Sequence, residues 1–261
     1  LNVNGTAICH CRLGYTGNGK TCQRKRVIAC NDLKADIVFV LDMSGSAGLQ
    51  NWYKQKNFIQ TILGDLQRVD GFKKNRIRIA AIKFSSRVHL IFGFLSLFSE
   101  RRKIVKTLNA AKYVSGSTGT GDALKFVRKN IFLNEKPNKD RSNIVVLISD
   151  GKWRKQQKGS DPYDEAPKLR ENGTMIFAVT LHGHRYPDLT ELNTFTGDPR
   201  RVFPVDDYES LNKALSFQLL DEVCFETESH CNHGQPHCTC DKFRHNCICD
   251  PGYKSKNNMC K

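Results

Sequence analysis

The stretch DIVFVLDMSGSAG, residues 36–48, decides the fold of this chain. Its apolar run is continuous and β-branched, which is typical of a strand buried on both faces of a sheet. Asp42, Ser44 and Ser46 follow at alternate positions, so their side chains lie on one side of the turn that leaves the strand. The next segment, 48–68, is long enough for a helix. The stretch therefore predicts a buried strand whose carboxyl end carries oxygen donors.

The same alternation continues along the central part of the chain. Short β-branched runs predict further strands, and apolar residues at helical spacing predict helices between them. The expected strands are 36–41, 76–84, 144–148 and 175–180, and the expected helices are 52–66, 100–111, 121–132, 162–171 and 207–220. Strands that alternate with helices of these lengths favour an α/β fold with a doubly wound, mainly parallel sheet.

Two later segments add oxygen donors to those of residues 36–48. SGSTGTGDAL, residues 115–124, is a Gly- and Thr-rich loop, and NIVVLISDG, residues 143–151, reads as a strand that ends in Asp. Hydroxyls with two carboxylates suit Mg²⁺, with Mn²⁺ or Ca²⁺ as alternatives. The carboxyl ends of strands are also where open α/β sheets bind ligands. The predicted metal ligands are Asp42, Ser44, Ser46, Thr118 and Asp150.

A simpler interpretation of the first segment is helix capping, because Asp and Ser are preferred at helix N-termini. Each segment taken alone favours such a reading, whereas three in this order favour the metal site. Together they resemble the von Willebrand factor type A domain, with its D-x-S-x-S motif, Thr-containing loop and strand-end Asp-Gly. The resemblance covers about residues 30–224, with Ser117 standing where the family usually has a second Gly.

This resemblance implies a Rossmann-like fold and a metal-ion-dependent adhesion site. In such a site an acidic side chain of a protein partner completes the coordination of Mg²⁺, and the surrounding loops contact the rest of the partner. An extracellular matrix protein such as collagen is the expected partner. Some members of the family also change affinity by shifting the last helix, which corresponds to 207–220 here.

The cysteines divide the chain into a large centre and two small ends. Four of the eleven lie at or before Cys30 and seven at or after Cys224, with none between. This distribution is typical of one self-sufficient core flanked by small disulfide-bonded modules in a secreted protein. The chain has no apolar run long enough to span a bilayer and begins at Leu1 without a signal peptide, so we expect a processed fragment.

Residues 1–23 resemble the second half of an epidermal growth factor-like module, with Cys9-His-Cys11, Gly14-Tyr15 and Cys22. The resemblance implies a disulfide between Cys11 and Cys22 and places the partner of Cys9 upstream of Leu1. A free thiol or an intermolecular bridge at Cys9 is the alternative. A basic linker, 24–29, follows. Its Arg24-Lys25-Arg26 is open to two interpretations, a processing site or a polyanion-binding patch.

The central domain is expected to span 30–224, and the family often joins such ends by a disulfide, here Cys30 with Cys224. Residues 225–261 resemble a complete epidermal growth factor-like module of the class without calcium. The resemblance implies the pairs Cys231–Cys240, Cys238–Cys247 and Cys249–Cys260, although six cysteines allow fifteen connectivities. A zinc site that includes His233, His237 and His245 is the rival interpretation. The whole arrangement is similar to matrilin-class matrix proteins.

Charge is the second strong signal, since 41 Lys and Arg against 26 Asp and Glu give a net charge of +15. Such a chain favours acidic partners, and outside cells these are sulfated glycosaminoglycans rather than nucleic acid. The basic run 152–155 directly follows Asp150 and is expected to border the metal site. The alternative function is therefore a structural matrix component that binds such polymers. The predicted polyanion-binding residues are Lys73, Lys74, Arg76, Arg101, Arg102, Lys103 and Lys106.

Two N-glycosylation sequons begin at Asn4 and Asn172, in keeping with secretion. Catalysis is not expected. Ser44 and Ser46 lack the G-x-S-x-G elbow of hydrolases, and the chain contains no H-E-x-x-H motif.

Overall fold

The structure is a computed structural model that describes most of the central region and short pieces of both ends. The described central ranges are 34–69, 77–133, 141–151, 153, 159–180 and 187–203. Near the ends it describes 2–3, 6–7, 15–17, 21–24, 238–241, 246–249, 255–256 and 259–260.

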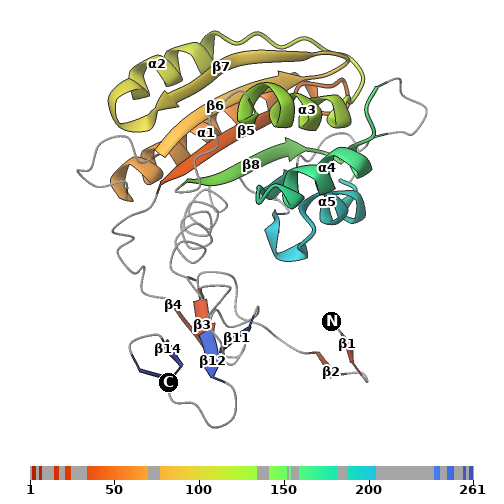
Figure 1. The fold of residues 1–261 in the computed structure, drawn as a ribbon. Coiled ribbons are helices and arrows are strands. Elements are labelled where there is room, and N and C mark those ends of the chain that lie inside the picture. The colour runs from red at the N-terminus through yellow and green to blue at the C-terminus, as the bar shows by residue number, and fades with distance from the viewer. Residues whose placement is uncertain are drawn as a thin grey trace.

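The centre of the fold is a six-stranded sheet (Figure 1). Its spatial order is β10-β9-β8-β5-β6-β7, and all neighbours are parallel except the antiparallel pair β6–β7. The strands are β5 (Ala35–Asp42), β6 (Ile77–Phe84), β7 (Val88–Ser96), β8 (Ser142–Ser149), β9 (Met175–Thr180) and β10 (Val202–Phe203). This confirms the α/β class with a mainly parallel sheet.

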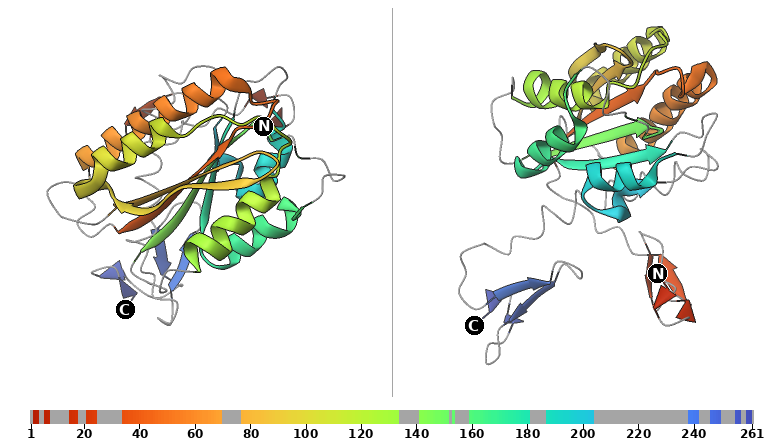
Figure 2. Two further views of the ribbon diagram at one scale, coloured as in Figure 1. Left: turned by 90° about the horizontal axis from the view of Figure 1, so that it is seen from above. Right: turned by 90° about the vertical axis from the view of Figure 1, so that its right-hand side faces the viewer.

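Helices cover both faces of this sheet (Figure 2). The helical elements are α1 (Gly48–Val69), α2 (Leu97–Ala110), α3 (Thr120–Phe126), the π-helix η1 (Val127–Phe132), α4 (Pro162–Glu171), α5 (Leu189–Thr196) and the 3₁₀ turn η2 (Pro199–Arg201). Among the described residues, no helix combines the length and hydrophobicity needed to cross a bilayer.

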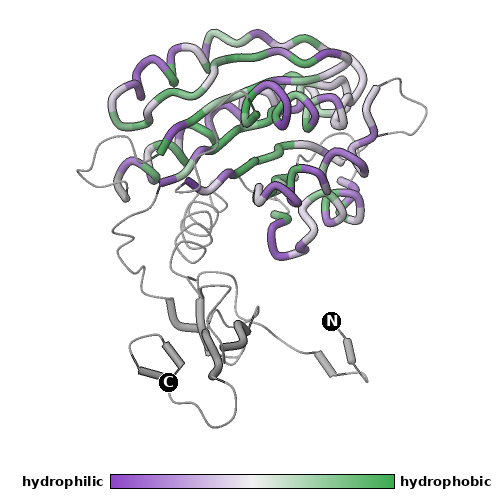
Figure 3. The backbone as a smooth tube through the Cα atoms, in the orientation of Figure 1, coloured by the Kyte–Doolittle hydropathy of each residue, from purple (hydrophilic) through white to green (hydrophobic). Residues whose placement is uncertain are grey.

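Alternation along β5 builds a separate hydrophobic core on each face. Ile37 and Phe39 point into the core shared with α1 and α2, whereas Val38 and Val40 point into the core shared with α3, η1, α4 and α5. All four side chains are essentially inaccessible to solvent. The middle parts of the central strands are accordingly hydrophobic in Figure 3. Burial on both faces explains why the sequence of β5 reads as one continuous apolar run.

Sequence patterns alone missed β7, β10 and α5. β7 is an edge strand joined to β6 by the turn at 85–87, and its pairing with β6 shifts register beside Ala81. This irregularity and the exposure of Leu90 blur the alternation that marks a half-buried strand. α5 has only eight residues, and three of them are Thr, so apolar periodicity does not reveal it. Its capping residues, Asp188 and Gly197, are a better sequence indication of a helix here.

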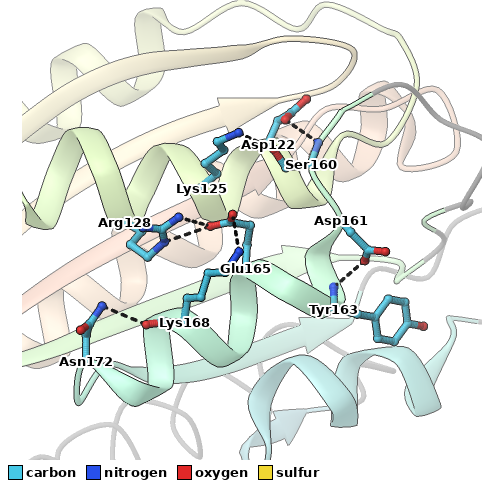
Figure 4. Close-up of polar contacts among 9 residues, drawn as sticks. All are labelled: Asp122, Lys125, Arg128, Ser160, Asp161, Tyr163, Glu165, Lys168 and Asn172. Atoms are coloured by element: carbon cyan, nitrogen blue, oxygen red, sulfur yellow. Dashed lines mark hydrogen bonds and ion pairs between the residues drawn. The ribbon is translucent and has the colours of Figure 1, made fainter.

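The expected helix 121–132 is two consecutive helical elements. The α-helix ends at Phe126, and the chain continues as a π-helix from Val127 to Phe132. At this wider turn Arg128 donates two hydrogen bonds to Glu165 of α4, with its Nη2 2.6 Å from Oε2 (Figure 4). The pair joins η1 to α4, two of the helical elements that cover this face.

Short antiparallel hairpins appear in both terminal regions. β3 (Tyr15–Gly17) pairs with β4 (Cys22–Arg24), β11 (Cys238–Asp241) with β12 (Asn246–Cys249), and β13 (Ser255–Lys256) with β14 (Met259–Cys260). β1 (Asn2–Val3) pairs with β2 (Thr6–Ala7). The other residues of interest there, including Asn4, Cys9, Cys11, Cys30, Cys224, Cys231 and the helix expected at 207–220, lie outside the described part of the chain.

Candidate metal centre

Sheet topology brings the predicted ligand segments together at the carboxyl ends of the parallel strands, here called the metal edge. β5 and β8 are parallel neighbours, with Leu41 opposite Ile148, so Asp42 at the end of β5 and Asp150 directly after β8 lie at the same end of the sheet. The 115–119 loop joins them through the amide of Gly45, which donates to the carbonyl of Gly116 at 2.9 Å. The structure thus brings the three segments together as predicted.

Glycines let this loop pack tightly against the turn between β6 and β7. The amide of Gly119 donates to the Ser85 carbonyl at 3.0 Å. A Cβ on Gly119 would lie 2.7 Å from that carbonyl oxygen, and a Cβ on Gly116 would lie 2.5 Å from Ser86 Oγ. Larger residues would push the loop away from the edge, so these two glycines set the position of Thr118.

Asp42 is fully buried and held by neutral donors. Its Oδ1 accepts the Ser44 amide at 2.8 Å, and its Oδ2 accepts the Ser149 hydroxyl at 2.8 Å. Gln55 of α1 fixes the backbone from below by donating Nε2 to the Asp42 carbonyl at 2.7 Å. These bonds fix the carboxylate in one orientation.

The side-chain hydroxyls of the two serines of the motif contact each other. Ser44 Oγ lies 3.1 Å from Ser46 Oγ and accepts the Ala47 amide at 3.3 Å. Tyr113 reaches across from the loop after α2 and donates its hydroxyl to the Ser44 carbonyl at 3.0 Å. Ser44 Oγ thus bonds to the turn that precedes α1, which begins at Gly48, and not to an amide of the helix itself.

The electrostatics of this edge call for a cation. Burial first, and the neighbouring Asp150 second, raise the pKa of Asp42 from 3.8 to about 6. At the opposite end of the same strand, Asp36 is also buried, but Arg78 and Arg141 each approach its carboxylate to 2.6 Å. Among the described residues, Asp42 has no such arginine or lysine. A divalent cation would supply the missing positive charge.

The donor chemistry also fits a hard cation. Thr118 is buried, and the hydroxyl of Thr120, two residues on, has no hydrogen-bond partner within the described ranges. The same part of the chain holds no group of three or more His, Cys, Asp or Glu side chains suited to a metal. Asp, Ser and Thr side chains offer oxygen atoms, which are the donors that hard divalent cations prefer.

A second acidic group supports the segment after Asp150. The Asp188 amide donates to the Asp150 carbonyl at 3.0 Å, and Glu191 Oε2 accepts the Trp153 amide at 3.1 Å. Glu191 is only 4% exposed. Burial, followed by Asp188, Asp150 and Asp161, raises its pKa from 4.5 to about 7. This edge therefore concentrates negative charge beyond the two predicted ligands.

Four residues at this site were not predicted from the sequence: Ser149, Gln55, Tyr113 and Glu191. A signal existed for Ser149, because a polar residue directly before Asp150 interrupts an otherwise apolar strand. The other three come from helix and loop positions whose proximity to the site depends on the folded chain. They orient the backbone or the carboxylates rather than add ligands.

The predicted basic residues lie away from this edge or outside the described part. Arg102, Lys103 and Lys106 are exposed on α2, whereas Arg101 is half-buried. Lys103 pairs with Glu100 at 3.3 Å. Lys73, Lys74 and Arg76 and most of the 152–155 run are outside the described residues.

Comparison with known proteins agrees with this geometry. The sequence model of the von Willebrand factor type A domain matches residues 36–216. The mouse collagen alpha-4(VI) chain is 28% identical over 206 residues, which cover 77% of this chain and 8% of the relative. The transmembrane cell adhesion receptor mua-3 of Caenorhabditis elegans is 25% identical over 244 residues, 86% of this chain and 6% of that protein. The chain thus spans a small fraction of these relatives.

A solved structure is similar as well. Proximal thread matrix protein 1 from the mussel byssus, in a structure whose adhesion-site motif is occupied by zinc, has a TM-score of 0.60 and 25% sequence identity. The match covers 76% of this chain and 47% of that one.

Proposed function

The chain belongs to the von Willebrand factor type A domain family, and we propose that its metal edge binds an acidic side chain of an extracellular matrix protein. The observation that carries this proposal is the contrast between the two buried aspartates of β5. Asp36 has arginine partners, whereas Asp42 faces Asp150 and neutral donors.

The residues that would hold the cation are Asp42, Ser44, Ser46, Thr118 and Asp150. A bound Mg²⁺, with Mn²⁺ or Ca²⁺ as alternatives, supplies a positive charge that attracts a carboxylate oxygen of the partner. The chain's own residues prepare the site in advance. Ser149 and the Ser44 amide orient Asp42. Tyr113 connects the loop after α2 to the turn that contains Ser44. Such preorganisation lowers the ordering cost on binding.

Collagen or another matrix glycoprotein is the partner class that this family membership favours. Relatives include a collagen chain and a cell adhesion receptor, and a similar solved structure comes from a byssal matrix protein. A secreted, extracellular location accords with the sequons and the cysteine-rich ends. We propose no enzymatic activity, because Ser44 and Ser46 lack the G-x-S-x-G elbow of hydrolases and the sequence contains no H-E-x-x-H motif.

The test is capture of the purified chain on immobilised collagen in Mg²⁺ and then in EDTA. Wild-type capture should be lost in EDTA, and Asp150→Asn should lose capture in Mg²⁺ while remaining folded by circular dichroism. Glu171→Gln is the matched control, because it removes an exposed carboxylate at the far end of α4. Capture that survives both EDTA and Asp150→Asn would refute metal-dependent adhesion.

A second candidate function is binding of sulfated glycosaminoglycans, with the metal site serving only structure. It is favoured by the exposed cations Arg102 and Lys106 on α2 and by the net charge of +15. Heparin capture should then weaken with salt and ignore EDTA. Reversing Arg102 and Lys106 to Glu should reduce it, whereas Lys129→Glu, an exposed cation on η1, should not.

Epidermal growth factor-like modules at both ends complete the proposal, in an arrangement similar to matrilin-class proteins. The backbone hairpins β3–β4, β11–β12 and β13–β14 are compatible with such modules. Non-reducing peptide mapping should find Cys11–Cys22, Cys30–Cys224, Cys231–Cys240, Cys238–Cys247 and Cys249–Cys260. A different pairing, or zinc released from reduced cysteines, would contradict this part.

A further inference from the structure

The end of α4 coincides with one of the two sequons, Asn172-Gly173-Thr174. The Gly173 amide donates to the Arg170 carbonyl at 2.9 Å, and the Thr174 amide donates to the Leu169 carbonyl at 3.1 Å. Gly173 has φ 75°, in the left-handed region. These features define a Schellman motif, which satisfies the last carbonyls of the helix and fixes the sequon in one conformation.

The local surface has room for a large substituent. Asn172 is exposed, as are the residues on either side of it. A Cβ added at Gly173 would meet no described atom within 4 Å. Asn172 Nδ2 donates to the Lys168 carbonyl at 2.9 Å (Figure 4). An amide nitrogen that carries a sugar keeps one hydrogen, so this capping bond can persist after modification.

We propose that Asn172 carries an N-linked oligosaccharide. The bond forms between Nδ2 and the anomeric carbon of a lipid-diphosphate-linked oligosaccharide donor. The bond from that carbon to the diphosphate oxygen breaks, and the proton lost by the amide leaves with the lipid diphosphate. Transfer occurs on the extended chain in the secretory pathway, so the burial of Thr174 in the folded domain does not oppose it. The inference rests on the extracellular location proposed above.

Helix capping is the competing explanation for this sequence. Asn and Gly are both favoured at helix C-termini, so capping accounts for Asn172 and Gly173. It places no demand on the side chain at 174, whereas glycosylation requires a hydroxyl there. Replacing Thr174 therefore separates the two explanations without disturbing the cap.

The glycan would stand well away from the metal edge. α4 has ten residues, so its two ends lie about 15 Å apart. Its first turn is capped by Asp161 beside the metal-side loops, and Asn172 lies at the other end (Figure 4). An oligosaccharide at Asn172 would cover the opposite edge of the domain and leave the adhesion edge open.

The experiment uses the whole chain secreted from animal cells, as wild type, Thr174→Val and Thr174→Ser. Trypsin should release the peptide from Glu171 to Arg185, which contains one sequon. Peptide mass spectrometry before and after N-glycosidase treatment in heavy-oxygen water should find the glycan on wild type and on Thr174→Ser. Thr174→Val should carry no glycan. It retains the Asn-Gly pair, so it measures how much Asp arises by spontaneous deamidation instead of glycan removal.

An unmodified wild-type peptide from the secreted, folded chain would overturn the proposal and leave capping as the role of Asn172. That outcome would not bear on metal-dependent adhesion, which the EDTA experiment tests separately. A modified peptide in Thr174→Val at the wild-type level would also overturn it, because the hydroxyl would then be irrelevant.

Discussion

Replacing Glu191 by Gln is expected to stabilise the metal-free protein by about 3 kcal/mol above pH 7. Glu191 is 4% exposed, and burial, followed by the surrounding carboxylates Asp188, Asp150 and Asp161, raises its pKa from 4.5 to about 7. Each pKa unit corresponds to about 1.4 kcal/mol, which sets the size of the effect. Gln retains an oxygen that can accept the Trp153 amide, so the native hydrogen bond survives the change.

The sign follows from proton linkage. Between pH 4.5 and 7 the folded protein keeps a proton on Glu191 that the unfolded chain has released. The wild-type free energy of unfolding therefore falls as pH rises through this window. Gln does not titrate, so its advantage is absent below about pH 4.5 and complete above about pH 7.

Urea unfolding in EDTA, followed by fluorescence of the two tryptophans, measures the difference at several pH values. Glu171→Gln controls for the loss of an exposed carboxylate and should show little pH-dependent difference. Mg²⁺ should shrink the Glu191→Gln gain, because a cation beside Asp150 offsets the same repulsion. A gain equal at pH 5 and pH 8, or a loss at pH 8, would refute the reasoning.

Three further substitutions test other parts of the fold. Ser149→Ala removes a hydroxyl that orients the first aspartate, so calorimetric titration should show Mg²⁺ affinity reduced about 10- to 100-fold, and unchanged affinity would contradict its role. Gly121→Ala would place a Cβ 1.8 Å from the Ser160 carbonyl and should cost at least about 3 kcal/mol in urea unfolding; Gly93→Ala, in open space, should be nearly neutral. Lys56→Met removes an ammonium from the carbonyls that end α2 and should cost about 1 kcal/mol; equal midpoints of thermal unfolding would argue against that cap.

The sequence predicted the central strands well because burial on both faces leaves a strong signal. The run 36–41 became Ala35–Asp42, and 175–180 became Met175–Thr180. It failed at the sheet edge, where β7 is exposed on one side and irregular in register. Edge strands and eight-residue helices have too few buried positions for periodicity to identify them.

The five proposed metal ligands follow from residue type and order in the sequence, whereas the residues that orient them depend on the folded register. Parallel pairing of Leu41 with Ile148 sets Ser149 beside Asp42, and no pattern within either strand contains that pairing. Gln55 reaches the Asp42 carbonyl because α1 packs back against β5. The proposed ligands form a motif that can be recognised in the sequence. The hydrogen bonds that orient them join segments that are distant in the sequence, so they cannot be recognised in the same way.

The rigidity of the strands explains why the site should respond to protons and cations rather than by moving. Leu41 and Ile148 are completely buried beneath Asp42 and Asp150, so the carboxylates cannot separate without unpacking the core. Burial first, and repulsion from Asp150 second, raise the pKa of Asp42 to about 6, and either a proton or a cation relieves this unfavourable charge. The two compete for one carboxylate, so Mg²⁺ affinity should fall as pH drops from 7 towards 5. Calorimetric titration at several pH values measures this, and an affinity that does not change across that range would mean that Asp42 is not a ligand.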